Sequence, residues 1–175
     1  NFRNILEAKW LPINKGRKET YEIPCILGAA YGCTKQWYQY IDGFAGHKNW
    51  GTLEPYISLK SWLFGGSCML TPHIYTAHMF KPSGTHNTPL YRLIYNKLYV
   101  ASVLFNKHDK SRLIDFLGSN PQVEAAKREY ESDLDFIKFK RSEYEKKTVL
   151  DIRDYCKRWN IDFRENESTV VSDVS

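Results

Sequence analysis

The sequence has few of the residues that build disulfide scaffolds and membrane anchors. Its 175 residues include four cysteines, Cys25, Cys33, Cys68 and Cys156, and none of them forms a C-x-x-C pair. This spacing excludes a dense disulfide framework and favours reduced thiols, which predicts a cytoplasmic protein. The chain has no run of about 18 apolar residues and does not open with a signal-peptide pattern, so we expect no contact with a membrane.

The sequence also lacks a strong charge of one sign. Its 25 Lys and Arg residues outnumber its 20 Asp and Glu residues, for a formal net charge of +5. This mild excess permits a phosphate-bearing ligand or a nucleic acid but does not require one. Hydrophobic residues make up 42% of the chain, enough for the core of one domain. The aromatic share of 15% suits a site that holds sugars or bases against flat faces.

The most informative stretch is residues 50–81, WGTLEPYISLKSWLFGGSCMLTPHIYTAHMFK. It predicts a helix that begins after a Trp-Gly pair and ends at Gly65-Gly66, one of which supplies the left-handed position after the helix. Thr52 is the expected N-cap of this helix. A short strand over residues 67–70 and a histidine-bearing turn follow.

This stretch resembles the acceptor-side (C-terminal) half of a GT-A fold family-2 glycosyltransferase, closest to the polypeptide N-acetylgalactosaminyltransferase branch. The likeness rests on Trp-Gly, Ser-x-Lys/Arg-x-Trp, Gly-Gly, a strand ending in proline, and His-x-Phe-Arg/Lys. The residues that match without a gap are Trp50, Gly51, Ser58, Lys60, Trp62, Gly65, Gly66, Pro72, His78, Phe80 and Lys81. The likeness extends over residues 21–107, although Ala45 stands where the family has an acidic residue.

The resemblance implies an α/β fold, the second half of a GT-A (nucleotide-diphospho-sugar transferase) domain with a C-terminal helical extension. We expect residues 1–107 to form the acceptor-side half, residues 108–164 the helical extension, and residues 165–175 a polar tail. Within the extension, Asn120-Pro121 predicts the start of one charged helix that continues through Ile137.

Shorter patterns predict four further elements. Residues 23–27 are expected to form a strand, and Thr34 is expected to cap a helix that reaches residue 41. Helical periodicity returns at residues 90–105 and again at residues 148–159.

The resemblance assigns a metal ligand and two donor-binding residues. His78 matches the histidine that completes a divalent-cation site in the family, and oxygen ligands with one imidazole suit Mn²⁺, with Mg²⁺ as the second choice. Lys81 would face the diphosphate of a nucleotide sugar, and His86 would contact the nucleotide. The alternatives are a structural histidine at 78, a solvated lysine at 81 and an ordinary loop histidine at 86.

Glu54 is the candidate catalytic residue. A carboxylate at this helix start in the family takes the proton from the attacking hydroxyl or positions the acceptor. The gap-free position is Leu53, so Glu54 is rotated by about 100° around the helix. Trp50 and Gly51 would form a wall of the donor or acceptor site. The alternatives are a carboxylate that complements the helix dipole and a tryptophan that packs in the core.

The carboxylate motif that binds the metal in this family precedes the acceptor half, and it does not occur there in this sequence. An Asp-x-Asp motif is present at Asp133 to Asp135, within a charged helical pattern that we interpret as a solvated helix face. We therefore expect an upstream polypeptide to supply the nucleotide-binding half and its metal ligands.

Three functions fit these patterns. The first is a metal-dependent glycosyltransferase that moves a sugar from a nucleotide-diphosphate donor to an acceptor hydroxyl on a protein or glycan. The second is a catalytically silent module of the same fold that binds a glycan or protein. The third is a glycosyltransferase acting on modified DNA bases, for which the basic balance and the aromatic residues would serve phosphate and base contact.

Overall fold

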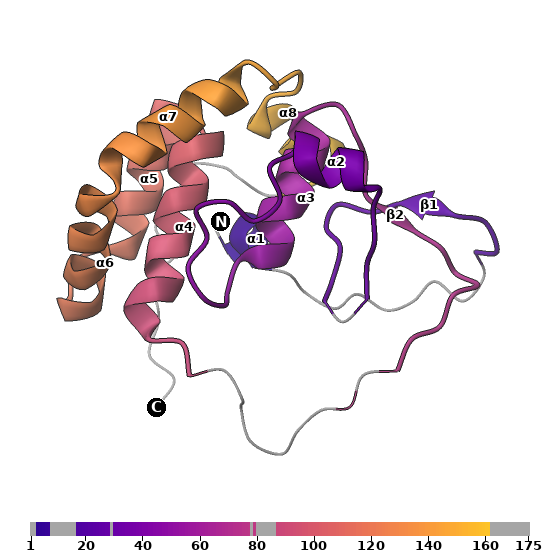
Figure 1. Cartoon of the computed structure of the whole chain (residues 1–175), viewed down its shortest axis with the longest axis horizontal. Coiled ribbons are helices and arrows are strands. Elements are labelled where there is room, and N and C mark those ends of the chain that lie inside the picture. Colours follow the sequence, from indigo (N-terminus) through magenta and orange to yellow (C-terminus); the bar gives the residue numbers. More distant parts are fainter. Residues whose placement is uncertain (1–2, 8–16, 29, 78, 80–86, 162–175) are drawn as a thin grey trace.

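The computed structural model describes residues 3–7, 17–28, 30–77, 79 and 87–161. This part of the chain is mainly helical, with a small antiparallel sheet of two strands (Figure 1). In chain order the elements are α1 (Arg3–Leu6), β1 (Tyr21–Glu22), α2 (Lys35–Tyr40), α3 (Leu53–Leu63), β2 (Met69–Leu70), α4 (Leu90–Leu104), α5 (Lys107–Leu117), α6 (Pro121–Ser132), α7 (Leu134–Glu145) and α8 (Ile152–Arg158). Helices and strands are both present, as the sequence predicts, but the helices dominate.

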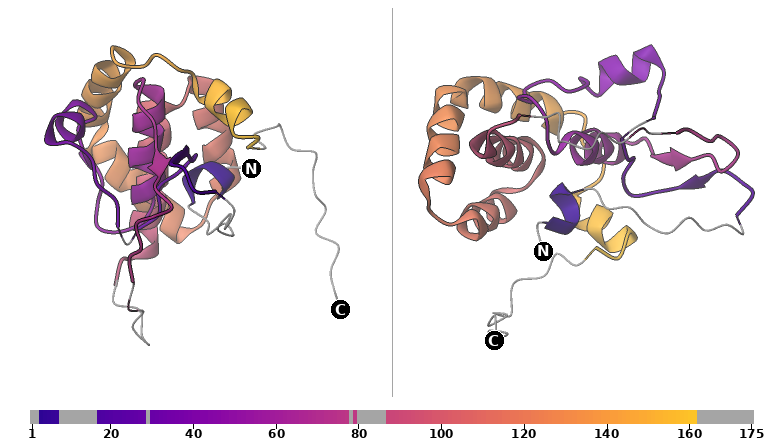
Figure 2. Two further views of the ribbon diagram at one scale, coloured as in Figure 1. Left: turned by 90° about the vertical axis from the view of Figure 1, so that its right-hand side faces the viewer. Right: turned by 90° about the horizontal axis from the view of Figure 1, so that it is seen from below.

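Helix α3 is the central element. It lies between the C-terminal helices on one side and the sheet on the other (Figures 1 and 2). Every residue from Pro55 to Leu63 is buried, polar ones included. Ser58 accepts a hydrogen bond from the Ile26 backbone N–H (3.0 Å), and Ser61 accepts one from the Trp37 indole (3.4 Å). Because buried polar groups require partners, these bonds fix the neighbouring segments against α3.

The predicted ends of α3 are confirmed, but its predicted cap is not. The helix begins at Leu53, and Gly65 after its end has the left-handed φ of +87°. Thr52 occupies the N-cap position with a left-handed φ of 63°, and its side chain makes no capping hydrogen bond. The first turn of α3 is therefore not capped by the Thr52 side chain.

The sheet is shorter than the sequence predicts. Strand β1 pairs with β2 in the register Tyr21 to Leu70 and Glu22 to Met69. One more ladder bond follows, from the Ile23 N–H to the Cys68 carbonyl (2.9 Å). The strand predicted over residues 23–27 is wrong, because Pro24 has no N–H to continue the ladder.

The C-terminal half is a group of helices packed on α4, which forms as predicted. Helix α4 contacts α5, α6 and α7, and Figure 1 shows these helices side by side. Asn120 caps α6 as predicted, accepting bonds from the N–H groups of Gln122 and Val123. The single helix predicted to run through residue 137 is wrong, because it is divided at Asp133 into α6 and α7. Helix α8 begins at Ile152, later than predicted, with Asp151 as its N-cap.

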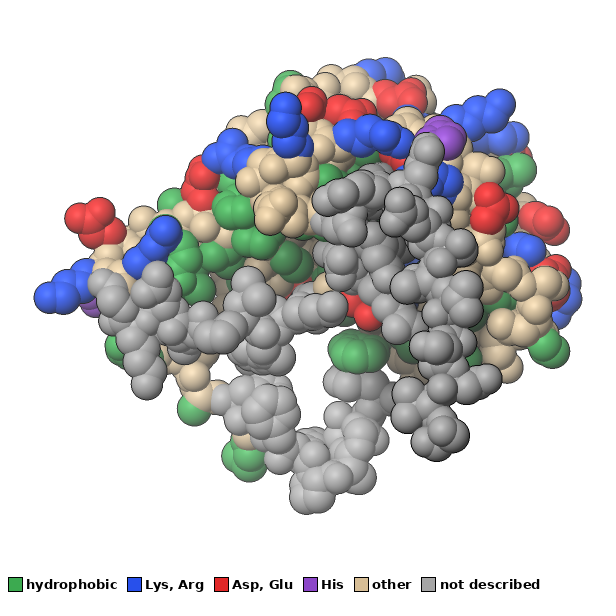
Figure 3. Space-filling view, turned by 180° about the vertical axis from the view of Figure 1, so that it is seen from behind, with side chains coloured by type: hydrophobic (Ala, Val, Ile, Leu, Met, Phe, Trp, Pro, Cys, Tyr) green, Lys and Arg blue, Asp and Glu red, His purple; other side chains and the backbone are tan. Residues whose placement is uncertain are grey.

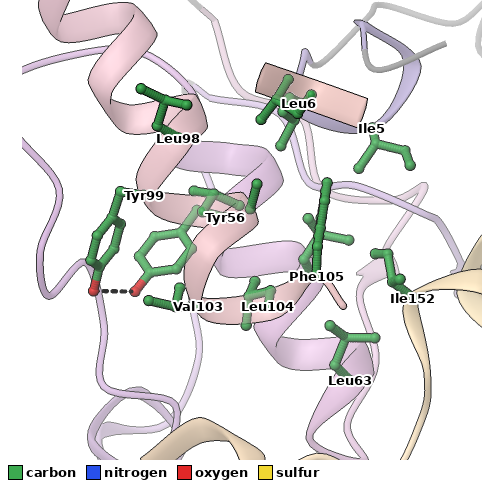
Figure 4. Close-up of a cluster of buried hydrophobic side chains, with 14 of the residues drawn as sticks. Ile5, Leu6, Tyr56, Leu63, Leu98, Tyr99, Val103, Leu104, Phe105 and Ile152 are labelled. Carbon is green, nitrogen blue, oxygen red and sulfur yellow. Dashed lines mark hydrogen bonds between the residues drawn. The ribbon is translucent and has the colours of Figure 1, made fainter. Parts of the chain in front are cut away.

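One cluster of buried side chains joins the two halves of the chain. Figure 4 shows a shared core formed by Leu6 of α1, Tyr56 and Leu63 of α3, Tyr99 of α4 and Ile152 of α8. The predicted boundary at residue 107 therefore crosses a continuous core, and the division into an acceptor half and an extension stays a prediction. No helix in the described ranges is long and apolar enough to cross a membrane.

Candidate functional site

The loop before α3 is held in place by one buried amide. Asn96 on α4 has no exposed surface. Its Oδ1 accepts from the Lys48 N–H (3.0 Å), and its Nδ2 donates to the carbonyls of Lys48 (2.9 Å), Trp50 (3.3 Å) and Gly51 (3.2 Å). Gly51 has a φ of +103°, and a Cβ there would lie 2.4 Å from Leu93 Cδ2, so the loop requires glycine. The predicted site residues Trp50 and Gly51 thus sit on a loop anchored to α4.

A neutral histidine lies beneath this loop. The His47 ring stacks on Tyr56, with 5.0 Å between ring centroids, and its Nε2 lies 2.7 Å from the Gly51 carbonyl. A carbonyl only accepts, so Nε2 carries the proton and donates it. Burial lowers the pKa of His47 to about 4, so the ring is neutral at physiological pH. Sequence reasoning missed this residue, because a single histidine in a loop carries no spacing signal.

A cluster of charges ties the same loop to the C-terminal helices. Lys48 Nζ lies 2.5 Å from an Asp133 oxygen and 3.0 Å from a Glu129 oxygen, and the Tyr95 hydroxyl donates to Asp133 (2.7 Å). Although partial burial acts to raise it, the hydrogen bonds from Lys48 and Tyr95 hold the pKa of Asp133 below its usual value. The interpretation of the Asp-x-Asp motif as a solvated face is therefore wrong for Asp133 and confirmed for the exposed Asp135.

Glu54 is a half-buried carboxylate in the first turn of α3. It lies against Gly28, where an added Cβ would be 2.5 Å from its Oε1. Within the described ranges Glu54 makes no hydrogen bond or ion pair. Burial raises the pKa of Tyr31, and the negative charge of Glu54 raises it further. Tyr31 itself is 45% exposed. The structure thus places Glu54 against Gly28, where its charge also acts on Tyr31.

The predicted donor side of the site is not described. His78, Lys81 and His86 lie outside the described residues. Trp50 is 48% exposed, so the alternative that it packs in the core is wrong. The described residues contain no group of three or more His, Cys, Asp or Glu side chains that could hold a metal ion. The metal site stays a prediction that depends on His78.

A second polar centre surrounds Lys60, which has no exposed surface. Its ammonium donates to the carbonyls of Asp42 (3.3 Å) and Gly43 and lies 3.9 Å from the centre of the Tyr56 ring. Burial lowers the pKa of Lys60 to about 7. Sequence reasoning identified Lys60 as a matched position, but nothing in the sequence indicated that it anchors the turn at residues 42–43.

Comparison of the chain with family models, with curated proteins and with solved structures gave no match.

Proposed function

We propose that this chain is the acceptor-binding side of a metal-dependent glycosyltransferase with a GT-A architecture. The reaction transfers a sugar from a nucleotide-diphosphate donor to an acceptor hydroxyl. The observation that supports it most directly is the Glu54 carboxylate, which is half-buried, bound to none of the described residues and placed beside Gly28. A carboxylate in this setting can accept the hydrogen of a hydroxyl group.

The other residues take the roles that the resemblance assigns. Trp50, exposed on its anchored loop, forms a wall of the sugar site, and Gly51 gives that loop its left-handed turn. His78 is the proposed metal ligand, while Lys81 and His86 contact the diphosphate and the nucleotide. A bound Mn²⁺ or Mg²⁺ ion neutralises charge on a leaving diphosphate. The described residues do not form a metal site by themselves, so the proposal includes an upstream polypeptide that supplies the remaining ligands.

The acceptor in this proposal is a protein or a glycan, because the face drawn in Figure 3 gives no support for nucleic-acid binding. Figure 3 shows basic and acidic side chains interspersed on the face opposite to that of Figure 1, with no continuous basic patch among its described residues. Binding to a phosphate backbone depends on clustered Lys and Arg side chains. The four cysteines are free, and a cytoplasmic location is part of the proposal because free thiols persist in a reducing compartment.

Calorimetry tests the donor side of the proposal. UDP would be titrated, with and without Mn²⁺, into this chain alone and into the chain combined with the polypeptide encoded immediately upstream. We expect Mn²⁺-dependent binding to the combination and a loss of at least about tenfold in affinity, or 1.4 kcal/mol, with His78→Ala. If the combination binds no nucleotide, or binds it equally well without His78, the proposed transferase is wrong and a silent binding module becomes the better account.

Glu54 is tested by sugar transfer in the same combined preparation. Replacing a general base or an acceptor-positioning carboxylate by an amide is expected to reduce kcat by about 10²-fold or more. Glu54→Gln would be compared with Glu131→Gln, which changes an exposed carboxylate on α6. Equal rates for the two variants would show that Glu54 has no part in transfer.

A further inference from the structure

A separate hollow lies at the surface where α2 ends. Its volume is about 400 Å³, and it is lined by Tyr38, Gln39, Asp42, Gly43, Phe44 and Ala45. The Tyr38 ring meets the Phe44 ring edge-on, with 6.2 Å between centroids. Gly43 has a φ of +39°, and a Cβ there would lie 2.4 Å from Cζ of Tyr38, so glycine allows this ring to approach the turn closely. Tyr38 as a whole is 42% exposed, so part of this residue is accessible to a ligand.

The carboxylate in this hollow is fixed on one side and open on the other. One oxygen of Asp42, Oδ2, accepts from Lys140 Nζ (2.6 Å) and from the Tyr144 hydroxyl (2.9 Å). The other oxygen, Oδ1, has no hydrogen bond to a described residue, and the side chain is 31% exposed. The hollow therefore contains a hydrogen-bond acceptor whose direction is set before any ligand arrives.

The backbone of the hollow is equally fixed. Lys60 donates to the carbonyls of Asp42 and Gly43, and the hydroxyls of Tyr56 and Tyr99 both donate to the Ala45 carbonyl at 2.9 Å. These donors are buried side chains of α3 and α4. A pocket whose walls are held by core residues needs little reorganisation on binding, which favours affinity.

The charges around the hollow select the chemistry of the ligand. Asp42 disfavours an anion, while Lys140 pairs with its carboxylate and Lys60 lies behind it, so a cation is disfavoured as well. What remains favourable is a neutral molecule with an apolar face for the aromatic ring and hydroxyl groups for the carboxylate and the Gln39 amide. Sugars combine these two features.

We propose that this hollow binds a neutral sugar residue, with its apolar face on Tyr38 and its hydroxyl groups bonded to Asp42 and Gln39. This site is distinct from the start of α3 and does not rest on the transferase proposal. It uses neither metal nor nucleotide.

Saturation-transfer NMR on the whole chain tests this site, with free neutral mono- and disaccharides in metal-free buffer. We expect at least one sugar to bind, with Tyr38→Ala lowering the affinity at least about tenfold, because it removes the stacking surface. Gln39→Ala is expected to lower it severalfold, because it removes one hydrogen-bonding group. Tyr75→Ala is the matched control, since Tyr75 is 88% exposed and lies outside the hollow. It should bind as the wild type does, and circular dichroism would verify that each variant is folded.

Three results would overturn the site. The first is that no sugar binds at roughly 10 mM, which is tenfold above a weak dissociation constant of about 1 mM. The second is that Tyr38→Ala and Tyr75→Ala bind sugar equally well. The third is that Glu54→Gln loses binding. The last result would move the sugar to the start of α3. A failure of UDP binding in the calorimetry leaves these measurements unaffected, so the two proposals fail separately.

Discussion

Lys60 has no exposed surface, which is rare for a lysine. Lys60 faces two carbonyls and two tyrosine rings, Tyr56 and Tyr144, the second with its centre 5.3 Å away. Carbonyl dipoles and ring faces stabilise the cation, yet burial outweighs them and brings the pKa to about 7. The protein therefore holds Lys60 close to the point at which it loses its charge.

The stability contributed at Lys60 depends on pH. Its pKa is about 7 when folded and has the ordinary value of 10.5 when unfolded, so the unfolded state binds the extra proton between these values. Stability from this group therefore rises with pH above 7, by up to about 1.4 kcal/mol per pH unit. In urea unfolding at pH 7, 8 and 9, the unfolding free energy of the wild type should rise relative to that of Lys60→Met by up to this amount per pH unit. Parallel curves would contradict it, and Lys138→Met, which changes an exposed lysine, serves as the control.

The Asn96 amide is expected to matter more than any surface polar residue on α4. Its Oδ1 accepts one bond, and its two N–H groups are shared among three loop carbonyls. At about 1 kcal/mol for each of these groups, Asn96→Ala should cost roughly 2–4 kcal/mol of unfolding free energy. Lys97→Ala, which breaks a partly exposed ion pair with Glu7, should cost less than about 1 kcal/mol. Urea unfolding of both variants measures the difference, and equal losses would show that the loop is not anchored by Asn96.

At the scale of helices and strands, the sequence predicts those elements that carry their own signals. Helix α4 follows from its apolar periodicity, and α6 begins at the Asn-Pro pair as expected. The break between α6 and α7 could not be predicted, because Asp133 is engaged by Lys48 and Tyr95 from distant parts of the chain. The sheet was misplaced by a few residues because strand propensity alone does not say where pairing stops.

Helices α5 and α8 are joined by a buried carboxylate. Asp109 has no exposed surface and bonds Arg153 at 2.8 and 3.2 Å and Arg112 at 3.3 Å. Asp109→Ala would remove these bonds to charged groups, while Arg153, whose side chain is 52% exposed, can be solvated instead, so we expect a loss of about 2 kcal/mol of unfolding free energy. Asp115→Ala on the exposed face of α5 is the control and should change the free energy by less than about 0.5 kcal/mol. Thermal unfolding of the two variants tests this link between α5 and α8. Similar melting temperatures for the two variants would show that Asp109 does not stabilise it.

For the whole molecule, the core predicts one cooperative unit. The backbone N–H of Val149 donates a hydrogen bond to the Leu63 carbonyl at the end of α3 (2.8 Å), and α4 packs on both α6 and α7. We expect the full chain to unfold in a single transition and a fragment of residues 1–107 to lack cooperative unfolding, because it would expose the face of α4 that these helices cover. Calorimetry of both proteins tests this expectation, and a cooperative transition in the fragment would instead support an independent acceptor half.

The two candidate sites differ in how far the sequence predicts them. Trp50, Gly51 and Glu54 are close together in the chain, so a local pattern was enough to propose them as site residues. The hollow at Asp42 depends on Lys140 and Tyr144, which lie 98 and 102 residues away. No pattern within a short window reports such a pairing, and only the folded arrangement brings it into view.

The uneven burial of the four thiols makes chemical labelling selective. Burial raises the pKa of Cys25 and Cys156 to about 12 and raises that of Cys68 as well, so these three are poor nucleophiles at neutral pH. Cys33 is exposed, between Tyr31 and the N-cap of α2. A maleimide fluorophore should therefore attach at Cys33 without any cysteine being removed. From there its emission would report on ligands arriving near Glu54 or at the Tyr38 hollow.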